Sequence, residues 1–445
     1  MGQNNDLSIE LVRLVTAGSV DDGKSTLIGR LLYDCDAVFE DQLKAAQEAS
    51  QRRGRGQLDL SLLTDGLEAE REQGITIDVA YRYFSRPRRR FIIADVPGHE
   101  QYTRNMITGA SQANIALILV DARKGMTTQS KRHLFVASLF NIPHILVIIN
   151  KMDLVGYRRD VYEKIKNDFM RFAAKLNLRD LRFMPLSALK GDMVVKRGNN
   201  LDWYQGPTLL AYLEETEISL DRNLIDFRLP IQYVIRPSQD FRGYAGQIAS
   251  GIVKVGDEVR ILPSGQASKI KEIWKGDKEV NFAFAPQSVL VVLEDELDVS
   301  RGEVIVRKEN LPIIGNEFEA MVAWFSSQPL NPKKSYLIKH CAKIVRADLG
   351  HLRYRLNIDT LHREEADQLM FNEIGRIKIR TNLPLIFDVF HKNKDTGSFI
   401  IIDELTNQTV GAGIIVSKGR NIDALVGSHS GAADFSGNEG AVLWF

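Results

Sequence analysis

Residues 18–26, near the N-terminus, have the spacing of a loop that binds phosphate groups. The order glycine, four residues, glycine, lysine and serine lets backbone N–H groups curl around two phosphates. Lys24 would reach the β and γ phosphate oxygens, and Ser25 would ligate Mg²⁺. The alternative is a simple glycine turn, but the apolar run 11–17 before the loop and the helical pattern 27–32 after it give the context that the motif requires. The predicted phosphate-binding residues are Gly18, Ser19, Val20, Asp21, Asp22, Gly23, Lys24, Ser25 and Thr26.

A second motif, Asp95-Val96-Pro97-Gly98, is predicted to face the same phosphates. The Asp95 carboxylate is expected near Mg²⁺ through a water molecule, and the Gly98 N–H is expected to point at the γ-phosphate. His99 follows directly and is the candidate catalytic residue, because a side chain there would align the water that attacks the γ-phosphate. The alternative for this motif is a Pro-Gly turn without a ligand.

Two further motifs, at residues 150–153 and 187–189, are predicted to select the base. The Asp153 carboxylate can accept both N1–H and the exocyclic amine of guanine, a donor pair that adenine lacks. Asn150 can bond the base and tether the phosphate loop, while the aliphatic stem of Lys151 can cover the ring. The backbone of Ser187, Ala188 and Leu189 can meet the guanine O6. Each motif alone is weak, but together they predict that the nucleotide is GTP.

Residues 72–77, Glu-Gln-Gly-Ile-Thr-Ile, lie between the first predicted helix and Asp95. Thr76 is predicted to complete the Mg²⁺ ligands with Ser25 and Asp95 and to sense the γ-phosphate. The segment 33–78 would then order with GTP and loosen after hydrolysis. The alternative is a solvated loop that enters a strand.

Apolar runs that are typical of strands precede these motifs. They cover residues 11–17, 91–95, 115–121, 144–150 and 183–186. Longer helical patterns alternate with them, which favours a parallel sheet with crossover helices. Loops at the carboxyl ends of such strands meet at one edge of the sheet, so the motifs are predicted to form one site. The predicted class is an α/β P-loop GTPase domain with a mostly parallel sheet and helices on both faces.

From about residue 228 onward the pattern changes to short β-rich runs broken by Gly, Pro, Asp and Asn. Runs of this kind are typical of barrels, and a second such block begins near residue 318. Two β-barrel domains are therefore predicted to follow the GTPase domain. The predicted parts are a GTP-binding domain over 1–225, barrels over 226–312 and 313–416, and a flexible tail over 417–445.

The composition excludes a general attraction to nucleic acid or to an anionic membrane, because 58 basic residues balance 57 acidic ones. Nucleic acid is not expected as a ligand. No apolar run reaches the roughly 18 residues of a membrane span. The two cysteines, Cys35 and Cys341, fit neither a metal site nor a disulfide framework. We expect a cytoplasmic protein.

The GTPase motifs followed by two β domains resemble the translation-factor GTPases, of which elongation factor Tu is the familiar member. The phosphate loop differs from the His-Val-Asp-His form usual there, because Ser19 and Asp22 stand at the two histidine positions. The stretches 18–34, 65–84 and 98–106 are similar instead to the large GTPase subunit of heterodimeric bacterial sulfate adenylyltransferase.

This resemblance implies that a smaller partner subunit makes adenosine 5′-phosphosulfate and pyrophosphate from ATP and sulfate. The present chain would supply GTP hydrolysis, with GTP and Mg²⁺ as ligands. The alternatives are a translation-type GTPase that delivers an RNA and a regulatory switch. Residues 441–445 resemble the first strand of an adenylylsulfate kinase. They predict that the chain is the N-terminal part of a bifunctional protein, the alternative being an ordinary apolar C-terminus.

Overall fold

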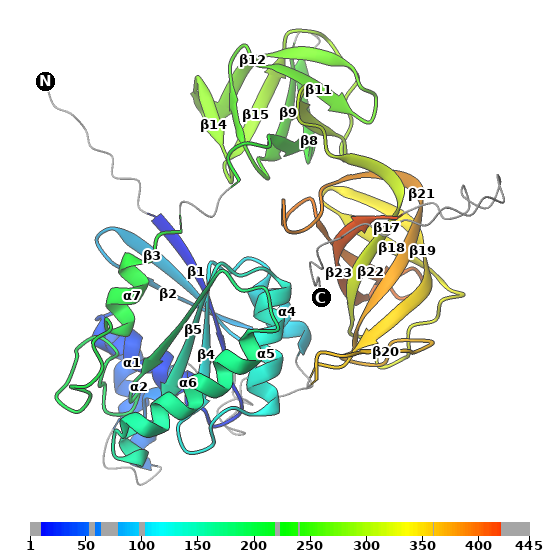
Figure 1. Ribbon diagram of the computed structural model, residues 1–445. Coiled ribbons are helices and arrows are strands. Elements are labelled where there is room, and N and C mark those ends of the chain that lie inside the picture. The colour runs from blue at the N-terminus through cyan, green and yellow to red at the C-terminus, as the bar shows by residue number, and fades with distance from the viewer. Residues whose placement is uncertain are drawn as a thin grey trace, which may run out of the picture. The chain divides into compact units, whose positions relative to one another are not determined.

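The computed structural model describes residues 10–52, 58–63, 79–97, 103–218, 223–238, 241–358 and 360–419. The chain divides into two compact units (Figure 1), the first formed by residues 1–221 and the second by nearly all of the rest. Thr76, Gly98, His99 and residues 420–445 lie outside the described residues, so the predictions made for them stay predictions.

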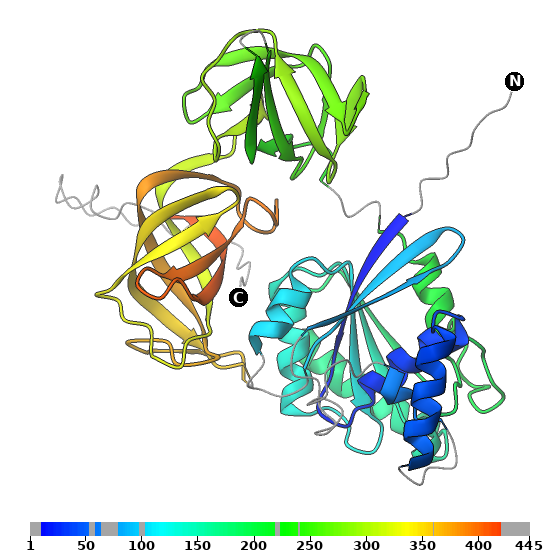
Figure 2. The ribbon, with the colours of Figure 1, turned by 180° about the vertical axis from the view of Figure 1, so that it is seen from behind.

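The first unit is built on a six-stranded sheet in the order β2-β3-β1-β4-β5-β6. Neighbouring strands from β3 to β6 are parallel, whereas β2 pairs antiparallel with β3 as a hairpin at the sheet edge (Figure 2). The mostly parallel sheet is confirmed, and β2 is an antiparallel edge strand that was not among the predicted strands. The strands are β1 (Glu10–Ala17), β2 (Ala80–Ser85), β3 (Arg89–Asp95), β4 (Ile115–Asp121), β5 (His144–Asn150) and β6 (Asp180–Pro185).

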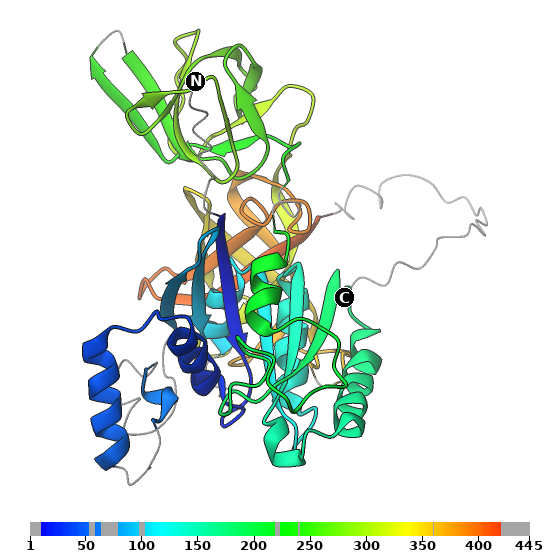
Figure 3. The same ribbon diagram turned by 90° about the vertical axis from the view of Figure 1, so that its left-hand side faces the viewer.

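Helices cover both faces of this sheet, as predicted (Figures 1 and 3). Every residue of β4 is buried, which explains its apolar run over residues 115–120, since a strand covered on both faces is typically apolar; only its last residue, Asp121, is charged. The helical elements are α1 (Lys24–Asp34), α2 (Glu40–Arg52), η1 (Leu60–Leu63), α4 (Thr103–Ala110), α5 (Thr128–Leu139), η3 (Met152–Val155), α6 (Arg159–Ala173) and α7 (Leu209–Glu215).

The second unit begins with a strongly curved antiparallel sheet in the order β7-β16-β11-β12-β15-β9-β8, with β13 paired to β12 and a separate β10-β14 pair. Alternate side chains enter one apolar core, as the burial pattern of β12 illustrates. The strands are β7 (Arg228–Pro230), β8 (Tyr233–Ser238), β9 (Phe241–Gln247), β10 (Ile252–Lys254), β11 (Glu258–Leu262), β12 (Ala267–Lys275), β13 (Lys278–Glu279), β14 (Phe282–Phe284), β15 (Ser288–Leu293) and β16 (Val304–Arg307).

The following sheet has the order β18-β22-β23-β17-β21-β19-β20, and the extra pairing of β18 with β19 closes it into a barrel. Its strands are β17 (Ile313–Trp324), β18 (Ser335–His340), β19 (Lys343–Leu356), β20 (Arg363–Glu364), β21 (Ile374–Phe387), β22 (Ser398–Asp403) and β23 (Thr409–Lys418). Because β23 extends to Lys418, the first two residues of the predicted tail belong to this barrel instead. We propose domain boundaries near residues 225 and 312, just before β7 and β17 begin.

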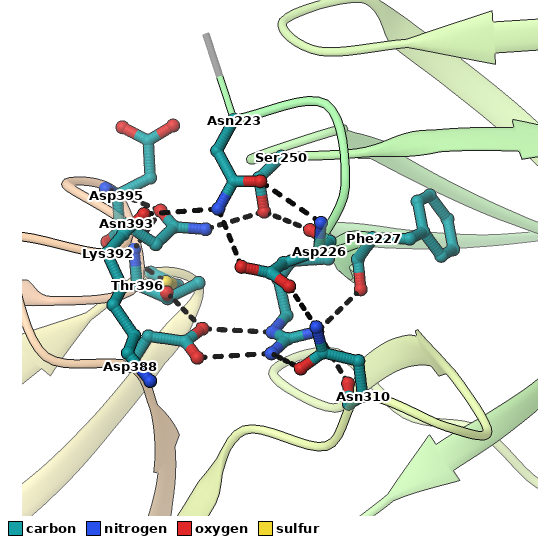
Figure 4. Close-up of polar contacts among 12 residues, drawn as sticks. Asn223, Asp226, Phe227, Ser250, Asn310, Asp388, Lys392, Asn393, Asp395 and Thr396 are labelled. Atoms are coloured by element: carbon teal, nitrogen blue, oxygen red, sulfur yellow. Dashed lines mark hydrogen bonds and ion pairs between the residues drawn. The ribbon is translucent and has the colours of Figure 1, made fainter.

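A buried ion pair in the second unit joins Arg228 on β7 to Asp388, which directly follows β21 (Figure 4). Arg228 donates from Nε and Nη2 to the two carboxylate oxygens of Asp388, at 2.9 and 3.1 Å. Its Nη1 donates to the carbonyl of Asn310 at 2.9 Å, and the Thr396 hydroxyl donates to Asp388 at 2.9 Å. Since Arg228 is 1% exposed, these bonds satisfy charges that water does not reach.

Within the described residues, no helix has both the length and the apolar character needed to cross a bilayer.

Candidate nucleotide-binding site

The predicted phosphate loop lies between β1 and α1, and the described backbone has the left-handed turn that it needs. Gly23 has a φ of 89° and is the residue before the first turn of α1. A Cβ at this position would lie 2.5 Å from Nδ2 of Asn150, so any other residue would both strain the backbone and displace Asn150. Glycine is therefore required by conformation and by space.

Lys24 opens α1 and is almost completely buried. Its Nζ donates to the carbonyls of Gly18 and Ser19, at 2.8 and 3.2 Å. Burial lowers the pKa of Lys24, while the nearby Asp95 and Asp22 carboxylates oppose that shift. Ser25 and Thr26 follow in the first helical turn, whose N–H groups have no intrahelical acceptor and favour an anion.

Ser19 and Asp22 bond to each other across the loop. The Ser19 N–H donates to Oδ2 of Asp22 at 2.6 Å, and the Asp22 N–H donates to the Ser19 carbonyl at 3.2 Å. Asp22 is 3% exposed, and burial raises its pKa against the opposing effects of the Ser19 N–H and Lys24. Val20 and Asp21 form the more exposed tip between them.

Asp95 ends β3 beside Thr16 on β1, where the two residues are in register. The Thr16 hydroxyl donates to Oδ1 of Asp95 at 2.9 Å, which orients this buried carboxylate toward the loop side of the sheet. Val96 and Pro97 are buried behind it. Asp95 is close enough to Lys24 for its charge to raise the pKa of that amine.

Asn150, at the end of β5, connects the phosphate loop to the predicted guanine loop. Its Nδ2 donates to the Asp22 carbonyl at 2.8 Å, and its Oδ1 accepts from the Ala188 N–H at 3.0 Å. The side chain is 2% exposed. One amide thus links the two loops that are predicted to hold the phosphates and the base.

The other predicted base-recognition residues lie around this link. The Ser187 hydroxyl donates to Oδ1 of Asp153 at 2.6 Å and so orients the carboxylate that is predicted to read guanine. Lys151 donates from Nζ to the Asp21 carbonyl and pairs with Asp121 at 3.0 Å, which extends its stem beside the phosphate loop. The Leu189 side chain is exposed.

Three contributing residues were missed by the sequence analysis. Thr16 orients Asp95, Asp121 orients Lys151, and Arg30 donates to the carbonyls of Ala188 and Leu189. A signal for Asp121 was available, because it ends β4 as a carboxylate directly beside Asn150 in the sheet register.

Asp121 is completely buried and remains ionised. Burial raises its pKa, but hydrogen bonds from Arg123 and Lys151 outweigh that effect and hold the pKa well below its usual range. A fixed negative charge behind Lys151 favours one position of that amine.

The described part of the chain brings together the phosphate loop, Asp95, the Asn150 motif and the 187–189 loop.

Comparison with known families gives two matches. Residues 9–226 match the family described as Elongation factor Tu GTP binding domain. Residues 317–416 match the family described as GTP-eEF1A C-terminal domain-like. The first match covers all described residues of the candidate site, and GTP binding is the property that it assigns to them.

Individual proteins are similar over most of the chain. The protein named Sulfate adenylyltransferase subunit 1 from Bacteroides fragilis is 50% identical over 417 residues, which are 93% of this chain and 88% of that protein. Bifunctional enzyme CysN/CysC from Mycobacterium tuberculosis is 52% identical over 412 residues, 91% of this chain and 67% of that protein. A solved structure of sup35 complexed with GMPPNP is 23% identical with a TM-score of 0.41, covering 94% of this chain and 98% of that one.

Proposed function

The chain belongs to the family of sulfate adenylyltransferase subunit 1, and we propose that it couples GTP hydrolysis to the activation of sulfate. Sulfate activation joins sulfate to the α-phosphorus of ATP and releases pyrophosphate. The observation that carries the GTPase assignment is the bridge made by Asn150 between Asp22 and Ala188. This bridge sets the spacing between phosphate recognition and base recognition.

Guanine is the base that this arrangement suits. Asp153 offers a carboxylate whose orientation is set by the Ser187 hydroxyl, and a carboxylate pairs with the adjacent N1–H and amine donors of guanine. Adenine has an unprotonated N1 and would place an acceptor against that charge. Lys151, positioned by Asp121, would cover one face of the base.

Mg²⁺ fits the donors on the phosphate side. Ser25, at the start of α1, and the buried Asp95 are oxygen donors of the kind that Mg²⁺ prefers, and Thr76 is the third proposed ligand. When bound, Mg²⁺ would neutralise negative charge on the β and γ phosphates. Asp95 is held for this role by the Thr16 hydroxyl.

Hydrolysis of GTP needs a positioned water molecule and stabilisation of the charge that develops on the phosphates. We assign the first task to His99 and the second to Lys24 with the N–H groups of the loop. Lys24 is already directed along the loop by its bonds to Gly18 and Ser19, so little reorganisation would be needed when phosphate replaces those acceptors.

The adenylyl transfer itself belongs to a partner in this proposal. The relatives' name, subunit 1, implies a second subunit. We propose that this partner is the smaller catalytic subunit, which binds ATP and sulfate. Sulfate is a weak nucleophile and its anhydride with AMP is high in energy, so the hydrolysis of GTP can supply the driving force. The GTP and GDP states must then contact the partner differently.

GTP hydrolysis by the chain with its partner tests the assignment of His99. We expect His99→Ala to retain GDP affinity and to lose most of the GTP hydrolysis rate, because His99 is assigned to the water and not to the nucleotide. His351, an exposed residue of β19, provides the matched control as His351→Ala. Full hydrolysis by His99→Ala would contradict the role of His99.

A further inference from the structure

Arg30, on α1, reaches the predicted guanine loop from the side opposite to Asn150. Its Nε donates to the Ala188 carbonyl at 3.2 Å, and its Nη2 donates to the Leu189 carbonyl at 2.7 Å. The N–H of Ala188 donates to Oδ1 of Asn150 at 3.0 Å. The Ala188 carbonyl is thus bonded to Arg30 on α1, the helix that follows the phosphate loop. The Ala188 N–H is bonded to Asn150 at the end of β5.

The loop folds closely around the guanidinium. Gly191 has a φ of 82°, and its N–H donates to the Ser187 carbonyl at 2.8 Å, which closes the turn. A Cβ at residue 191 would lie 3.7 Å from Cδ of Arg30 and 3.8 Å from its Cζ. The Arg30 side chain therefore packs against Gly191 as well as bonding to the turn.

The two carbonyls that Arg30 holds determine the direction of two N–H groups. Because a peptide unit is planar, the C=O of Leu189 and the N–H of Lys190 lie in one plane and point in opposite directions. That Lys190 N–H donates to Oγ of Ser187 at 3.2 Å, and Ser187 Oγ donates to Oδ1 of Asp153 at 2.6 Å. A continuous chain of bonds thus runs from Arg30 to the Asp153 carboxylate.

We propose that Arg30 is a positioning residue for guanine recognition, which orients the Asp153 carboxylate through the Leu189–Lys190 peptide and the Ser187 hydroxyl. The inference rests on the proposed function only where it assigns Asp153 to guanine. An arginine suits the task because its planar fork can hold two carbonyls at once, which a single lysine ammonium does less well.

Asp34 offers a matched control. Its Oδ1 accepts from Nη1 of Arg30 at 3.4 Å, one helical turn further along α1. Asp34→Ala removes this partly buried pair but leaves both bonds from Arg30 to the loop. Arg30→Met keeps the aliphatic stem against Gly191 and removes every donor.

The test is competition of GDP, inosine diphosphate and ADP against a fluorescent guanine nucleotide on the full chain. Inosine lacks the exocyclic amine that Asp153 is proposed to read. We expect Arg30→Met to weaken GDP binding roughly tenfold, about the value of one charge-assisted hydrogen bond. Inosine diphosphate binding should weaken less, because inosine keeps N1–H but lacks the amine. ADP binding should not change. The preference for GDP over inosine diphosphate should therefore fall, while Asp34→Ala retains it.

The proposal would be overturned if Arg30→Met preferred GDP over inosine diphosphate as strongly as the wild type does. It would also be overturned if Asp34→Ala lost as much of this preference as Arg30→Met. If Arg30→Met does not fold, Arg30→Lys is measured instead. We expect it to have a weaker preference for GDP over inosine diphosphate than the wild type, and an unchanged preference would contradict the proposal. A wild-type chain that binds ADP as tightly as GDP would refute the proposed function itself, which separates the two failures.

Discussion

The backbone N–H of Ser19 donates to the carboxylate of Asp22 at 2.6 Å, and the Asp22 N–H donates back to the Ser19 carbonyl at 3.2 Å. These are the two positions at which the phosphate loop differs from that of the translation factors it resembles. The contact uses the side chain of residue 22 but only the backbone of residue 19. A carboxylate at 22 therefore closes a ring in the loop that the imidazole of a histidine would not reproduce in the same space.

Replacement of Asp22 by Ala tests this ring. The Ser19 N–H would lose its acceptor, and an unsatisfied part-buried donor costs about 1–3 kcal/mol. We expect the free energy of unfolding to fall by that amount and GDP affinity to fall with it, because the loop backbone loses its shape. Urea unfolding and fluorescent GDP binding measure the two effects. Ser19→Ala keeps the backbone N–H and should stay near the wild type, so equal losses in both variants would contradict this role of Asp22.

Asp153→Asn tests the reading of the base. An amide can accept from one guanine donor but presents N–H₂ to the other, whereas xanthine offers a carbonyl at that position. We expect the variant to lose affinity for GTP and to gain affinity for xanthosine triphosphate, measured by competition. Asp160→Asn, at an exposed position of α6, is the matched control. Undiminished guanine preference in Asp153→Asn would exclude Asp153 from the base site.

The Arg228–Asp388 pair should be important for the stability of the second unit. Arg228→Met would leave the Asp388 carboxylate buried with the Thr396 hydroxyl as its remaining donor among these contacts, and loss of one partner from a buried pair costs about 3–5 kcal/mol. The double variant Arg228→Met, Asp388→Leu should recover much of that loss, because no buried charge remains. Chemical unfolding of the three proteins measures the difference, and an unchanged single variant would contradict a structural role for the pair.

His133 should make the first unit less stable in mild acid. Burial, with smaller effects from the Lys24 and Arg132 cations, lowers the pKa of His133 from 6.5 to about 3. Between these values the unfolded chain takes up a proton that the folded chain does not, so the stability present above pH 6.5 falls as the pH decreases, by at most about 1.4 kcal/mol per pH unit. His133→Gln should flatten this slope in unfolding experiments between pH 7 and pH 4. An unchanged slope in His133→Gln would contradict this role of His133.

The strands and loops of the GTPase unit could be predicted from the sequence because their signals are local. Each motif directly follows a buried apolar run, and the rule for parallel sheets places the ends of such runs at one edge. The motif that begins at Asn150 predicted a tether to the phosphate loop, and the bond from Asn150 to Asp22 is present.

The contacts made by Arg30 could not be predicted in the same way. Arg30 and Ala188 are 158 residues apart, and an arginine on a helix surface is usually solvated. The Arg228–Asp388 pair joins residues 160 apart, one on β7 and the other directly after β21. Sequence spacing does not give the distance between two elements that are far apart in the chain. These pairings can therefore be found only in the folded structure.

Coupling of GTP hydrolysis to adenylyl transfer onto sulfate is the central claim, and one assay tests it most directly. The chain and its catalytic partner subunit are mixed with ATP and sulfate, and pyrophosphate release and GTP hydrolysis are followed together. We predict that GTP increases sulfate-dependent pyrophosphate release in proportion to GTP hydrolysed, and that a non-hydrolysable GTP analogue or the Lys24→Ala variant does not sustain this increase. The same pyrophosphate yield without GTP hydrolysis would contradict the account.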